Sequence, residues 1–487
     1  MHFMISVFVI IYDFVFRFYV FPYFPGNFSL KAISISRAIN SGFPAHTLHE
    51  VIFMNSIWQQ TSPLPSFEPQ KADFDTEVLI IGGGITGILC AYLLKQQGIR
   101  SVLIEADRLC SGTTGCTTAK ITAQHNQIYH KIAKTYGLQA ARQYLFANRQ
   151  AVERYRSLCA QTDCDFCEQS AFLYSRTSRR ELENELQTLQ KLGAPVQFSS
   201  CPNLPFGVAG AIEWKHQAQF HPLKLLASLL PELCIYEQTK ALRIENGQVI
   251  TNRGTIRAEK VIVATHFPIF NLRGGYFAKL YQYRSYVMAL KGVPPFDGMY
   301  LDIDPNGVSM RFHNDLLLLG GGSHRTGKSG GNWDALSAFA RKHFPDSSEV
   351  CRWAAQDCMT LDAIPYIGQY SPRTPNLFVA TGFQKWGMTS AMVAAELLRD
   401  LVLGKENELY RLYSPSRSIF HPQLVVNLGE TLLNFIRPTV PRCPHMGCAL
   451  RYNPAEHSWD CPCHGSRFGS EGELKDNPAT DDLSSRP

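Results

Sequence analysis

The sequence predicts an α/β protein with a doubly wound domain, an inserted domain built on a mixed sheet, and a small C-terminal β unit. Three observations support this prediction. Residues 77–95 run from a short apolar stretch through a glycine-rich turn into an apolar helical stretch. Residues 376–398 repeat this order of strand, turn and helix. Residues 443–464 carry two short motifs of Cys, His, Pro and Gly, far from either of the first two segments.

The first glycine-rich turn has the flanking elements of a dinucleotide-binding fingerprint. Residues 77–81 are of strand type, residues 82–87 match the pattern G-x-G-x-x-G, and residues 88–95 are of helix type. A second apolar strand, residues 101–104, ends at Glu105. The glycines allow a pyrophosphate to approach the helix N-terminus, and the acid is placed to bind ribose hydroxyls. A glycine-rich turn in an unrelated α/β domain is the alternative. The predicted cofactor-binding residues here are Gly82, Gly84, Gly87 and Glu105.

Three later segments indicate which dinucleotide is bound. Residues 111–120 form a hydroxyl-rich loop, residues 260–266 a buried strand with a small-residue turn, and residues 376–398 a strand that turns into a helix. With the fingerprint, this set resembles the FAD-dependent D-amino-acid oxidase/glycine oxidase superfamily over about residues 74–412. The resemblance implies a Rossmann-like FAD-binding domain in which the late helix N-terminus faces the flavin. It places the following residues against FAD: Ser111, Thr113, Thr114, Gly382, Gly387, Met388 and Thr389.

The middle of the chain resembles the substrate-binding insert of that superfamily. Strands are expected at residues 171–175 and 315–319, and a helix at residues 178–192. The polar residues expected to face the flavin are Arg284, Arg311, His324 and Lys385, with Trp386 as a wall beside the ring. Of these, Arg311, His324 and Trp386 are the predicted catalytic residues. A surface or supporting role is the alternative for each.

One position departs from the superfamily pattern. Amino-acid oxidases of this type tend to carry Gly-Leu-Arg-Pro-x-Thr-x-Asp-x-x-Pro-x-Ile-Gly. Residues 355–368 keep the Thr, the Asp, the second Pro and the Ile-Gly in register, but Asp357 stands where the pattern has Arg. Arginine binds a substrate carboxylate as a bidentate pair, whereas aspartate repels it. We therefore expect an amine or another cation as substrate; a capping role for Asp357 is the alternative.

The C-terminal motifs are Cys443-x-His445 and, after a fifteen-residue spacer, Cys461-x-x-His464. Two thiolates and two imidazoles can hold a [2Fe–2S] cluster, with the cysteines on one iron and the histidines on the other. Neutral imidazoles remove negative charge from such a cluster and raise its reduction potential. A zinc ion held by the same four residues is the alternative.

The complete motifs, residues 443–448 and 461–466, resemble the Rieske iron–sulfur family. The resemblance implies a disulfide between Cys448 and Cys463 that ties the two cluster loops together. Full Rieske domains precede their first loop with several strands, but only residues 421–442 stand here between the preceding domain and the first ligand. A unit of fewer than about fifty residues buries little core by itself, so we expect it to pack on its neighbour.

Composition agrees with a flavoprotein that carries a small appended unit. The chain has 487 residues, and ten of its fourteen cysteines lie outside the cluster motifs in no regular pattern, which favours a reducing, cytoplasmic location. A net charge of +6 is too small to indicate a nucleic-acid partner. The expected partners are a small-molecule substrate and a redox partner that accepts electrons.

Residues 1–28 are rich in Phe, Ile, Val and Tyr, but Asp13 and Arg17 interrupt the apolar run. The clean stretch, residues 3–12, is too short to span a bilayer, which needs ~20 residues. The segment beginning at Met54 resembles the usual start of the oxidoreductase family. We therefore expect residues 1–53 to be a mis-called extension, with a membrane-associated helix as the alternative; apart from that helix, no membrane association is expected.

These interpretations define the predicted domains. Residues 1–53 are the extension, residues 54–420 the FAD-dependent oxidoreductase, and residues 421–487 a linker and Rieske domain. The FAD-binding segments are about 74–165, 258–275 and 360–412, and the substrate domain comprises about 166–257 and 276–359.

The predicted function is oxidation of a small substrate, an amine being the favoured class, by FAD. Electrons then pass to the Rieske cluster and on to an external acceptor, as in a dehydrogenase. An oxidase that uses O₂ and keeps the cluster for structure is one alternative, and a redox sensor without turnover is another.

Overall fold

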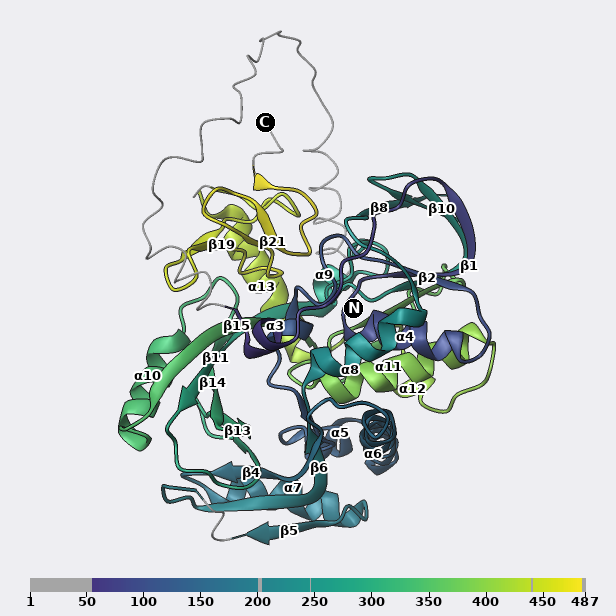
Figure 1. Ribbon diagram of the computed structural model, residues 1–487. Coiled ribbons are helices and arrows are strands. Elements are labelled where there is room, and N and C mark those ends of the chain that lie inside the picture. Colours follow the sequence, from purple (N-terminus) through teal and green to yellow (C-terminus); the bar gives the residue numbers. More distant parts are fainter. Residues whose placement is uncertain (1–54, 200–203, 246, 439–440, 484–487) are drawn as a thin grey trace. The chain divides into compact units, whose positions relative to one another are not determined.

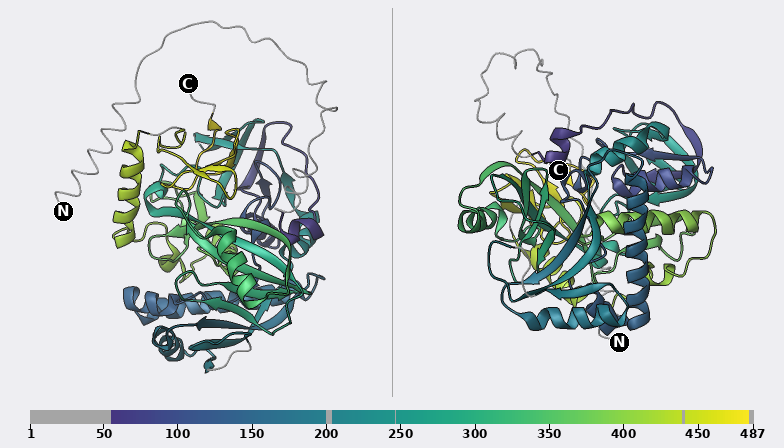
Figure 2. Two further views of the ribbon diagram at one scale, coloured as in Figure 1. Left: turned by 90° about the vertical axis from the view of Figure 1, so that its left-hand side faces the viewer. Right: turned by 60° about the horizontal axis from the view of Figure 1, so that its bottom comes forward.

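The computed structural model describes residues 55–199, 204–245, 247–438 and 441–483 (Figures 1 and 2). By its contacts the chain divides into Met1–His49 and Glu50–Pro487, so every described residue belongs to the second unit. The extension predicted at residues 1–53 lies outside the described residues. The described residues form three sheets, and the predicted α/β fold is confirmed.

The first sheet is doubly wound. Its strands are β1 (Phe74–Ile81), β2 (Ser101–Ile104), β7 (Cys234–Tyr236), β10 (Thr255–Val263), β16 (Tyr366–Gln369) and β17 (Leu377–Thr381), with the hairpin β8 (Ala241–Glu245) and β9 (Gln248–Thr251) beside β10. The order is β16-β17-β10-β1-β2-β7. All neighbours along this path are parallel except β16 and β17, which are antiparallel.

Apolar residues on both faces of β1 explain why this sheet is covered on both sides. Val78 and Ile80 pack in the core that includes α4 (Ile85–Lys95) and α11 (Gly387–Val402), whereas Leu79 and Ile81 pack in a second core. The turns β1–α4 and β17–α11 both follow the carboxyl ends of parallel strands, with β10 between them. Such a position at the edge of a parallel sheet is where dinucleotides bind.

The second sheet is mixed and belongs to the insert. Its strands are β3 (Lys120–Ile121), β4 (Cys167–Ser175), β5 (Val196–Ser199), β6 (Gly210–Gln219), β11 (Leu280–Lys291), β12 (Met299–Asp302), β13 (Ser309–His313), β14 (Leu316–Arg325) and β15 (Ser348–Thr360). The order is β15-β11-β14-β13-β12-β4-β6-β3, with β5 beside β6. Among these described strands, only the neighbours β4 and β12 are parallel. The chain between them is long enough to let β12 run in the same direction as β4.

Helices surround the insert and join it to the first domain. They are α5 (Ile128–Tyr136), α6 (Leu138–Cys159), α7 (Arg179–Lys191) and α10 (Asn332–His343). The shorter helical elements are α3 (Ile57–Thr61), η1 (Thr113–Cys116), α8 (Pro222–Leu229), η2 (Leu230–Glu232), α9 (Tyr276–Lys279) and α12 (Tyr410–Tyr413). Within the described chain, none of the helices has the length and apolar character needed to cross a bilayer.

The C-terminal unit begins with α13 (Pro422–Ile436) and continues as an antiparallel sheet. Its strands, in spatial order, are β18 (Arg451–Asn453), β19 (Ser458–Asp460), β20 (Arg467–Phe468) and β21 (Leu474–Asp476). The core of this unit is small, and four of its buried residues are cysteines. The unit therefore depends on its contacts with the first two domains, as the sequence predicts.

Candidate active site and cluster site

The turn after β1 has the geometry of a nucleotide-binding turn. Gly82 has φ +114°, and a Cβ at this position would lie 2.6 Å from Ala264 O. Gly84 is the N-cap of α4 and supplies no capping side chain, while the first N–H of the helix, at Ile85, donates to Thr114 Oγ1 at 3.0 Å. Glu105 Oε2 accepts a hydrogen bond from Gly83 N at 2.6 Å, and burial raises the pKa of Glu105. These residues fit the pyrophosphate and ribose of FAD.

Gly87 packs against the turn rather than facing a ligand. A Cβ on Gly87 would lie 2.0 Å from Gly82 O, a backbone atom that cannot move without displacing the turn. We expect Gly87→Ala to lower FAD affinity at least about tenfold and to lower the free energy of unfolding by roughly 1–3 kcal/mol. FAD retained after gel filtration and thermal unfolding measure the two effects. Gly207→Ala is the control, since a Cβ there meets no atom within 4 Å; equal FAD retention in both variants would contradict the prediction.

A cavity of about 1440 Å³ extends from this turn into the insert. It exceeds the volume of an ordinary small-molecule pocket, so a dinucleotide and a substrate can share it. Most predicted FAD ligands line this cavity: Gly82, Gly84, Glu105, Ser111, Thr113, Thr114, Gly382, Gly387 and Met388. Gly87 and Thr389 do not line it. Thr389 lies in the first turn of α11, and its hydroxyl is instead hydrogen-bonded to His125 Nε2 at 3.0 Å.

Two of the residues predicted near the flavin, Lys385 and Trp386, line the cavity. The Trp386 ring stacks on His125 with 4.6 Å between the ring centroids and 15° between their planes. Burial lowers the pKa of His125 to about 3, so this imidazole is neutral at physiological pH. The predicted role of Trp386 as a ring wall therefore fits its position.

Arg284, Arg311 and His324 do not line the cavity, and their predicted positions facing the flavin are corrected. Arg311 Nε donates to the Thr118 carbonyl at 2.6 Å, and the His324 ring stacks on a tyrosine. On β11 the residues that line the cavity are Tyr281, Ser285, Tyr286 and Val287 but not Arg284, and the pairing of β11 with β14 shifts register between Arg284 and Tyr286.

Asp357 lines the cavity as part of β15 and is paired with a lysine. Its Oδ2 lies 3.0 Å from Lys385 Nζ and accepts a hydrogen bond from Ser285 Oγ at 2.5 Å. Asp357 is therefore not a helix or turn cap, the alternative considered for it. The Lys385 ion pair also means that Asp357 does not present an uncompensated charge to a substrate.

Lys120 is a cavity residue that the sequence did not single out. It lies in β3, and its ammonium group donates to Tyr300 O at 2.8 Å and to Ser309 Oγ at 2.6 Å. Burial, with a smaller effect of Arg311, lowers the pKa of Lys120 to about 7. The sequence around Lys120 gave no indication of this role, because the groups that bind its ammonium group lie 180 and 189 residues later in the chain.

The lowered pKa of Lys120 predicts a pH-dependent contribution to stability. Between pH 7 and 10 the unfolded chain holds the Lys120 proton and the folded chain does not, so stability rises with pH in this range. We expect Lys120→Met to remove up to roughly 4 kcal/mol of this rise, measured by urea unfolding at pH 7 and pH 10. Lys71→Met at an exposed site is the control. An identical pH dependence in wild type and Lys120→Met would contradict the expectation.

The four predicted cluster ligands lie together in the C-terminal unit. The thiols of Cys443 and Cys461 hydrogen-bond to each other; burial raises the pKa of Cys443, whereas the neighbouring thiols lower that of Cys461. The rings of His445 and His464 have centroids 5.0 Å apart. Burial lowers the pKa of His464 to about 4, and its buried Nδ1 has no hydrogen-bond partner. A neutral imidazole nitrogen that has no partner and lies near the Cys461 thiol fits a metal ligand.

His445 is oriented by a residue outside the C-terminal unit. Its Nε2 lies 2.9 Å from Oδ1 of the buried Asn271 and donates to it. Donation from one ring nitrogen leaves the lone pair on the other, which is how metal-binding histidines are usually held.

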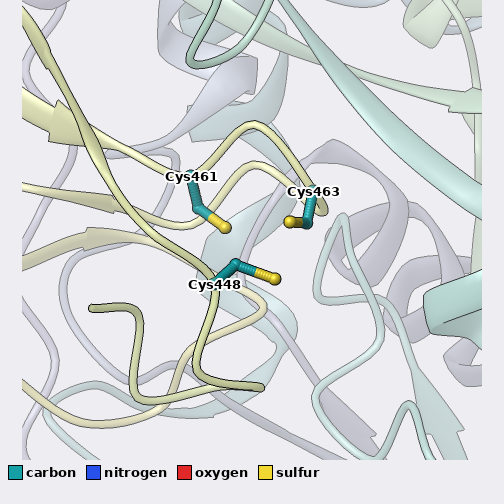
Figure 3. A group of neighbouring side chains, drawn as sticks. All are labelled: Cys448, Cys461 and Cys463. Atoms are coloured by element: carbon teal, nitrogen blue, oxygen red, sulfur yellow. The ribbon is translucent and has the colours of Figure 1, made fainter. Parts of the chain in front are cut away.

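Cys448 and Cys463 lie beside Cys461, with all three sulfurs within 4.8 Å of one another (Figure 3). The structure records Cys448 and Cys463 as separate thiols. The disulfide that the Rieske resemblance implies is therefore not formed here and stays a prediction for the protein with its cluster.

Two glutamines connect the cluster loops to the wall of the cavity. Gln282 Nε2 on β11 donates to His464 O at 2.9 Å, and Gln356 Nε2 on β15 donates to Gly465 O at 2.7 Å. The carbonyl of Gln356 accepts a hydrogen bond from Thr113 Oγ1, in the loop predicted to contact FAD, at 3.0 Å. One residue thus contacts both the cluster loop and the flavin loop.

The end of the C-terminal unit forms part of the cavity itself. Residues 474–477 and Asp482 line it together with the FAD turn. Asn477 Nδ2 donates to Thr265 O and Phe267 O at 2.8 and 2.9 Å, just after β10. The two predicted cofactor sites therefore share a wall.

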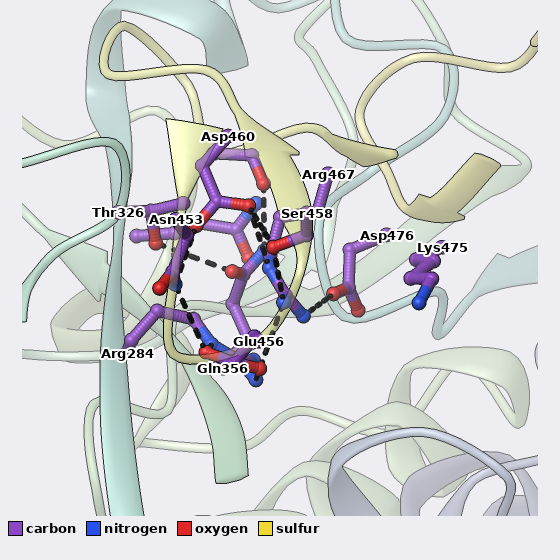
Figure 4. Close-up of polar contacts among 12 residues, drawn as sticks. Arg284, Thr326, Gln356, Asn453, Glu456, Ser458, Asp460, Arg467, Lys475 and Asp476 are labelled. Atoms are coloured by element: carbon purple, nitrogen blue, oxygen red, sulfur yellow. Dashed lines mark hydrogen bonds and ion pairs between the residues drawn. The ribbon is translucent and has the colours of Figure 1, made fainter. Parts of the chain in front are cut away.

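A buried polar network fixes the C-terminal unit on β11 (Figure 4). Glu456 is paired with Arg284 and with Arg467. Arg467 also contacts Asp460 Oδ1 at 3.0 Å and Asp476 Oδ2 at 2.9 Å. Burial by itself raises the pKa of Glu456, but the two arginines outweigh this effect and lower the pKa to about 2. Arg284, predicted near the flavin, thus anchors the cluster unit.

Comparison with known families matches both parts of the chain. The FAD dependent oxidoreductase family matches residues 77–401, and the Rieske [2Fe-2S] domain family matches residues 407–487. The chain belongs to the FAD-dependent oxidoreductase family and carries a C-terminal Rieske domain. Its cofactors are FAD and a [2Fe–2S] cluster, which confirms the predicted family, enzyme class and cofactors and replaces the zinc alternative.

Individual relatives match the larger part of this chain. A Bacillus subtilis protein named as a Rieske 2Fe-2S iron–sulfur protein, YhfW, is 37% identical over 87% of this chain and 95% of its own length. Gamma-glutamylputrescine oxidoreductase of Escherichia coli is 23% identical over 69% of this chain and 86% of its own. The glycine oxidase structure from Geobacillus kaustophilus has TM-score 0.61 and 22% identity, covering 71% of this chain and 99% of that chain.

Proposed function

We propose that this protein is a dehydrogenase that oxidises a small amine and passes the electrons through its cluster to an external acceptor. When bound, FAD would accept an electron pair, and the cluster would transfer electrons one at a time. The single observation that supports this route is the direct connection between the two predicted cofactor sites through Gln356. Gln356 contacts the cluster loop through Gly465 and the flavin loop through Thr113. A cluster kept only for structure would not require this direct connection to the flavin loop.

The residues around the cavity support an amine rather than an α-amino acid. Among the described residues that line it, carboxylates outnumber Lys and Arg, so the lining favours a cation. Arg108 is the one arginine among them, and it is paired with the buried Glu237 at 2.7 Å. No arginine of the described lining is thus available to bind a substrate carboxylate. The relative in Escherichia coli that is named for gamma-glutamylputrescine also supports an amine.

The test is anaerobic reduction of the protein with both cofactors bound. We expect primary amines and diamines to bleach the flavin absorbance and then to produce the EPR signal of a reduced Rieske cluster. Glycine and D-alanine are the comparison substrates and should bleach the flavin much more slowly. Flavin bleaching by glycine or D-alanine at an ordinary rate would contradict the substrate class.

The same samples decide between a dehydrogenase and an O₂-using oxidase. In air, a dehydrogenase should reduce an added one-electron dye faster than it consumes oxygen. A cluster that stays oxidised while the reduced flavin is reoxidised by O₂ would contradict the electron route and favour the oxidase.

A further inference from the structure

Helix α13 buries Leu424 together with the polar residues Asn427 and Asn434, whereas most of its other apolar residues are exposed. Asn427 and Asn434 are buried, and Asn427 Oδ1 accepts a hydrogen bond from Arg325 Nη1 at 3.0 Å. Glu430 is paired with Lys328 at 2.7 Å. The inward face of α13 is therefore stabilised by polar contacts with the protein. An ordinary surface helix turns most of its apolar side chains toward the core, whereas α13 exposes most of its own.

The outward face of α13 is a continuous apolar stripe. Its members, together with Phe420 two residues before the helix, are between 51% and 77% exposed: Phe420, Val425, Val426, Leu432, Leu433 and Ile436. The spacing from Val425 to Ile436 places these side chains on one side of a helix. These six, here called the α13 stripe, are nearly half of the large apolar side chains that are exposed in the described part of the chain.

We propose that the α13 stripe docks on the surface of an anionic lipid bilayer. The charges around the stripe favour a lipid surface as its binding partner. Residues 421–451 contain a single carboxylate, Glu430, which Lys328 already neutralises. Arg437 and Arg442 are exposed beyond the C-terminal end of the stripe. An apolar face without a free acid and with cations at its end matches anionic headgroups over acyl chains.

The size and chemistry of the stripe agree with a lipid surface. A helix of 15 residues is ~22 Å long and can lie in the plane of the interface. Protein-binding hot spots are enriched in Trp, Tyr and Arg, whereas five of the six stripe residues are Val, Leu or Ile. In Figure 2, α13 lies at the margin of the described chain, with no other described element beyond it. This proposal departs from the sequence-based expectation, which linked membrane association to residues 1–53 only.

The test uses the full chain with both cofactors and vesicles of phosphatidylcholine, with or without phosphatidylglycerol. We expect co-sedimentation with the anionic vesicles that weakens as salt is added. Leu432→Gln/Leu433→Gln should lower the partition coefficient about 30-fold, because two exposed leucines no longer enter the bilayer. The matched control is Leu138→Gln/Phe146→Gln on α6, whose side chains are 47% and 55% exposed. FAD and iron contents of each variant show that it is folded.

A charge variant tests the electrostatic part of the proposal. Arg437→Glu should weaken binding to anionic vesicles and leave any binding to neutral vesicles unchanged. Vesicle binding that is unaffected by the leucine substitutions would overturn the proposal, since residues 1–53 or another surface would then hold the protein. Absence of vesicle binding would also overturn it, and so would a dimer that the leucine substitutions dissociate, because the stripe would then bind a second copy.

Discussion

Replacing Cys461 by Ser should remove the cluster and leave FAD in place. Cys461 lies among the other cysteine thiols of the C-terminal unit, and a serine cannot supply the thiolate that a [2Fe–2S] cluster requires. We expect iron and acid-labile sulfide to fall below about a tenth of the wild-type content. The flavin absorbance should persist, since Cys461 does not line the cavity. The flavin should still be bleached by substrate, but reduction of a one-electron acceptor should be lost.

Cys234→Ser is the matched control, because Cys234 is exposed on β7 and belongs to the FAD domain. It should keep both cofactors. Retention of sulfide in Cys461→Ser would show that the ligand assignment is wrong. Equal rates of dye reduction in wild type and Cys461→Ser would show that electrons leave from the flavin, and that the cluster is not on their path.

Arg467→Leu should destabilise the C-terminal unit by about 3–5 kcal/mol, because it leaves buried carboxylates without their cation. Arg467 is 5% exposed and contacts Glu456, Asp460 and Asp476 (Figure 4). Urea unfolding followed through the cluster absorbance measures the loss. Arg341→Leu, on the last turn of α10, is the control for removing an arginine at an exposed site.

The pH dependence of this variant distinguishes a charge effect from a packing effect. In the wild type the pKa of Glu456 is held at about 2, so its ionic stabilisation is complete above pH 4.5 and is lost as the pH falls toward 2. In Arg467→Leu, burial with one arginine fewer raises this pKa, and protonation relieves the stranded charge. The stability difference between wild type and variant should therefore shrink from pH 7 to pH 4. A constant difference would show that Arg467 acts through packing alone.

The fold and the cofactors were predictable because their signals are local. The turn at residues 82–87 must lie between a strand and a helix, and the cluster motifs hold all four ligands within 22 residues. The helix expected at residues 178–192 appears as α7 with each end one residue shorter, whereas the strand expected at 315–319 appears as the longer β14, which continues to Arg325. Hydrophobic patterns report such elements well and their ends poorly.

The site depends on contacts that no local pattern contains. Arg311 was expected at the flavin, but its carbonyl partner is Thr118, almost two hundred residues earlier. Lys120 is buried by Tyr300 and Ser309 in the same long-range manner. The face that a strand residue presents depends on the register of its neighbours, so Ser285 rather than Arg284 could be placed in the cavity only from the structure.

Residues 474–477, near the C-terminus, form part of the boundary of the FAD cavity. During synthesis on the ribosome this segment emerges after every other element that encloses the cofactor. The nascent chain can therefore fold its nucleotide-binding turn early, but the wall of the FAD cavity is complete only after β21 has been synthesised. A chain that ends before β21 would therefore lack this part of the cavity wall.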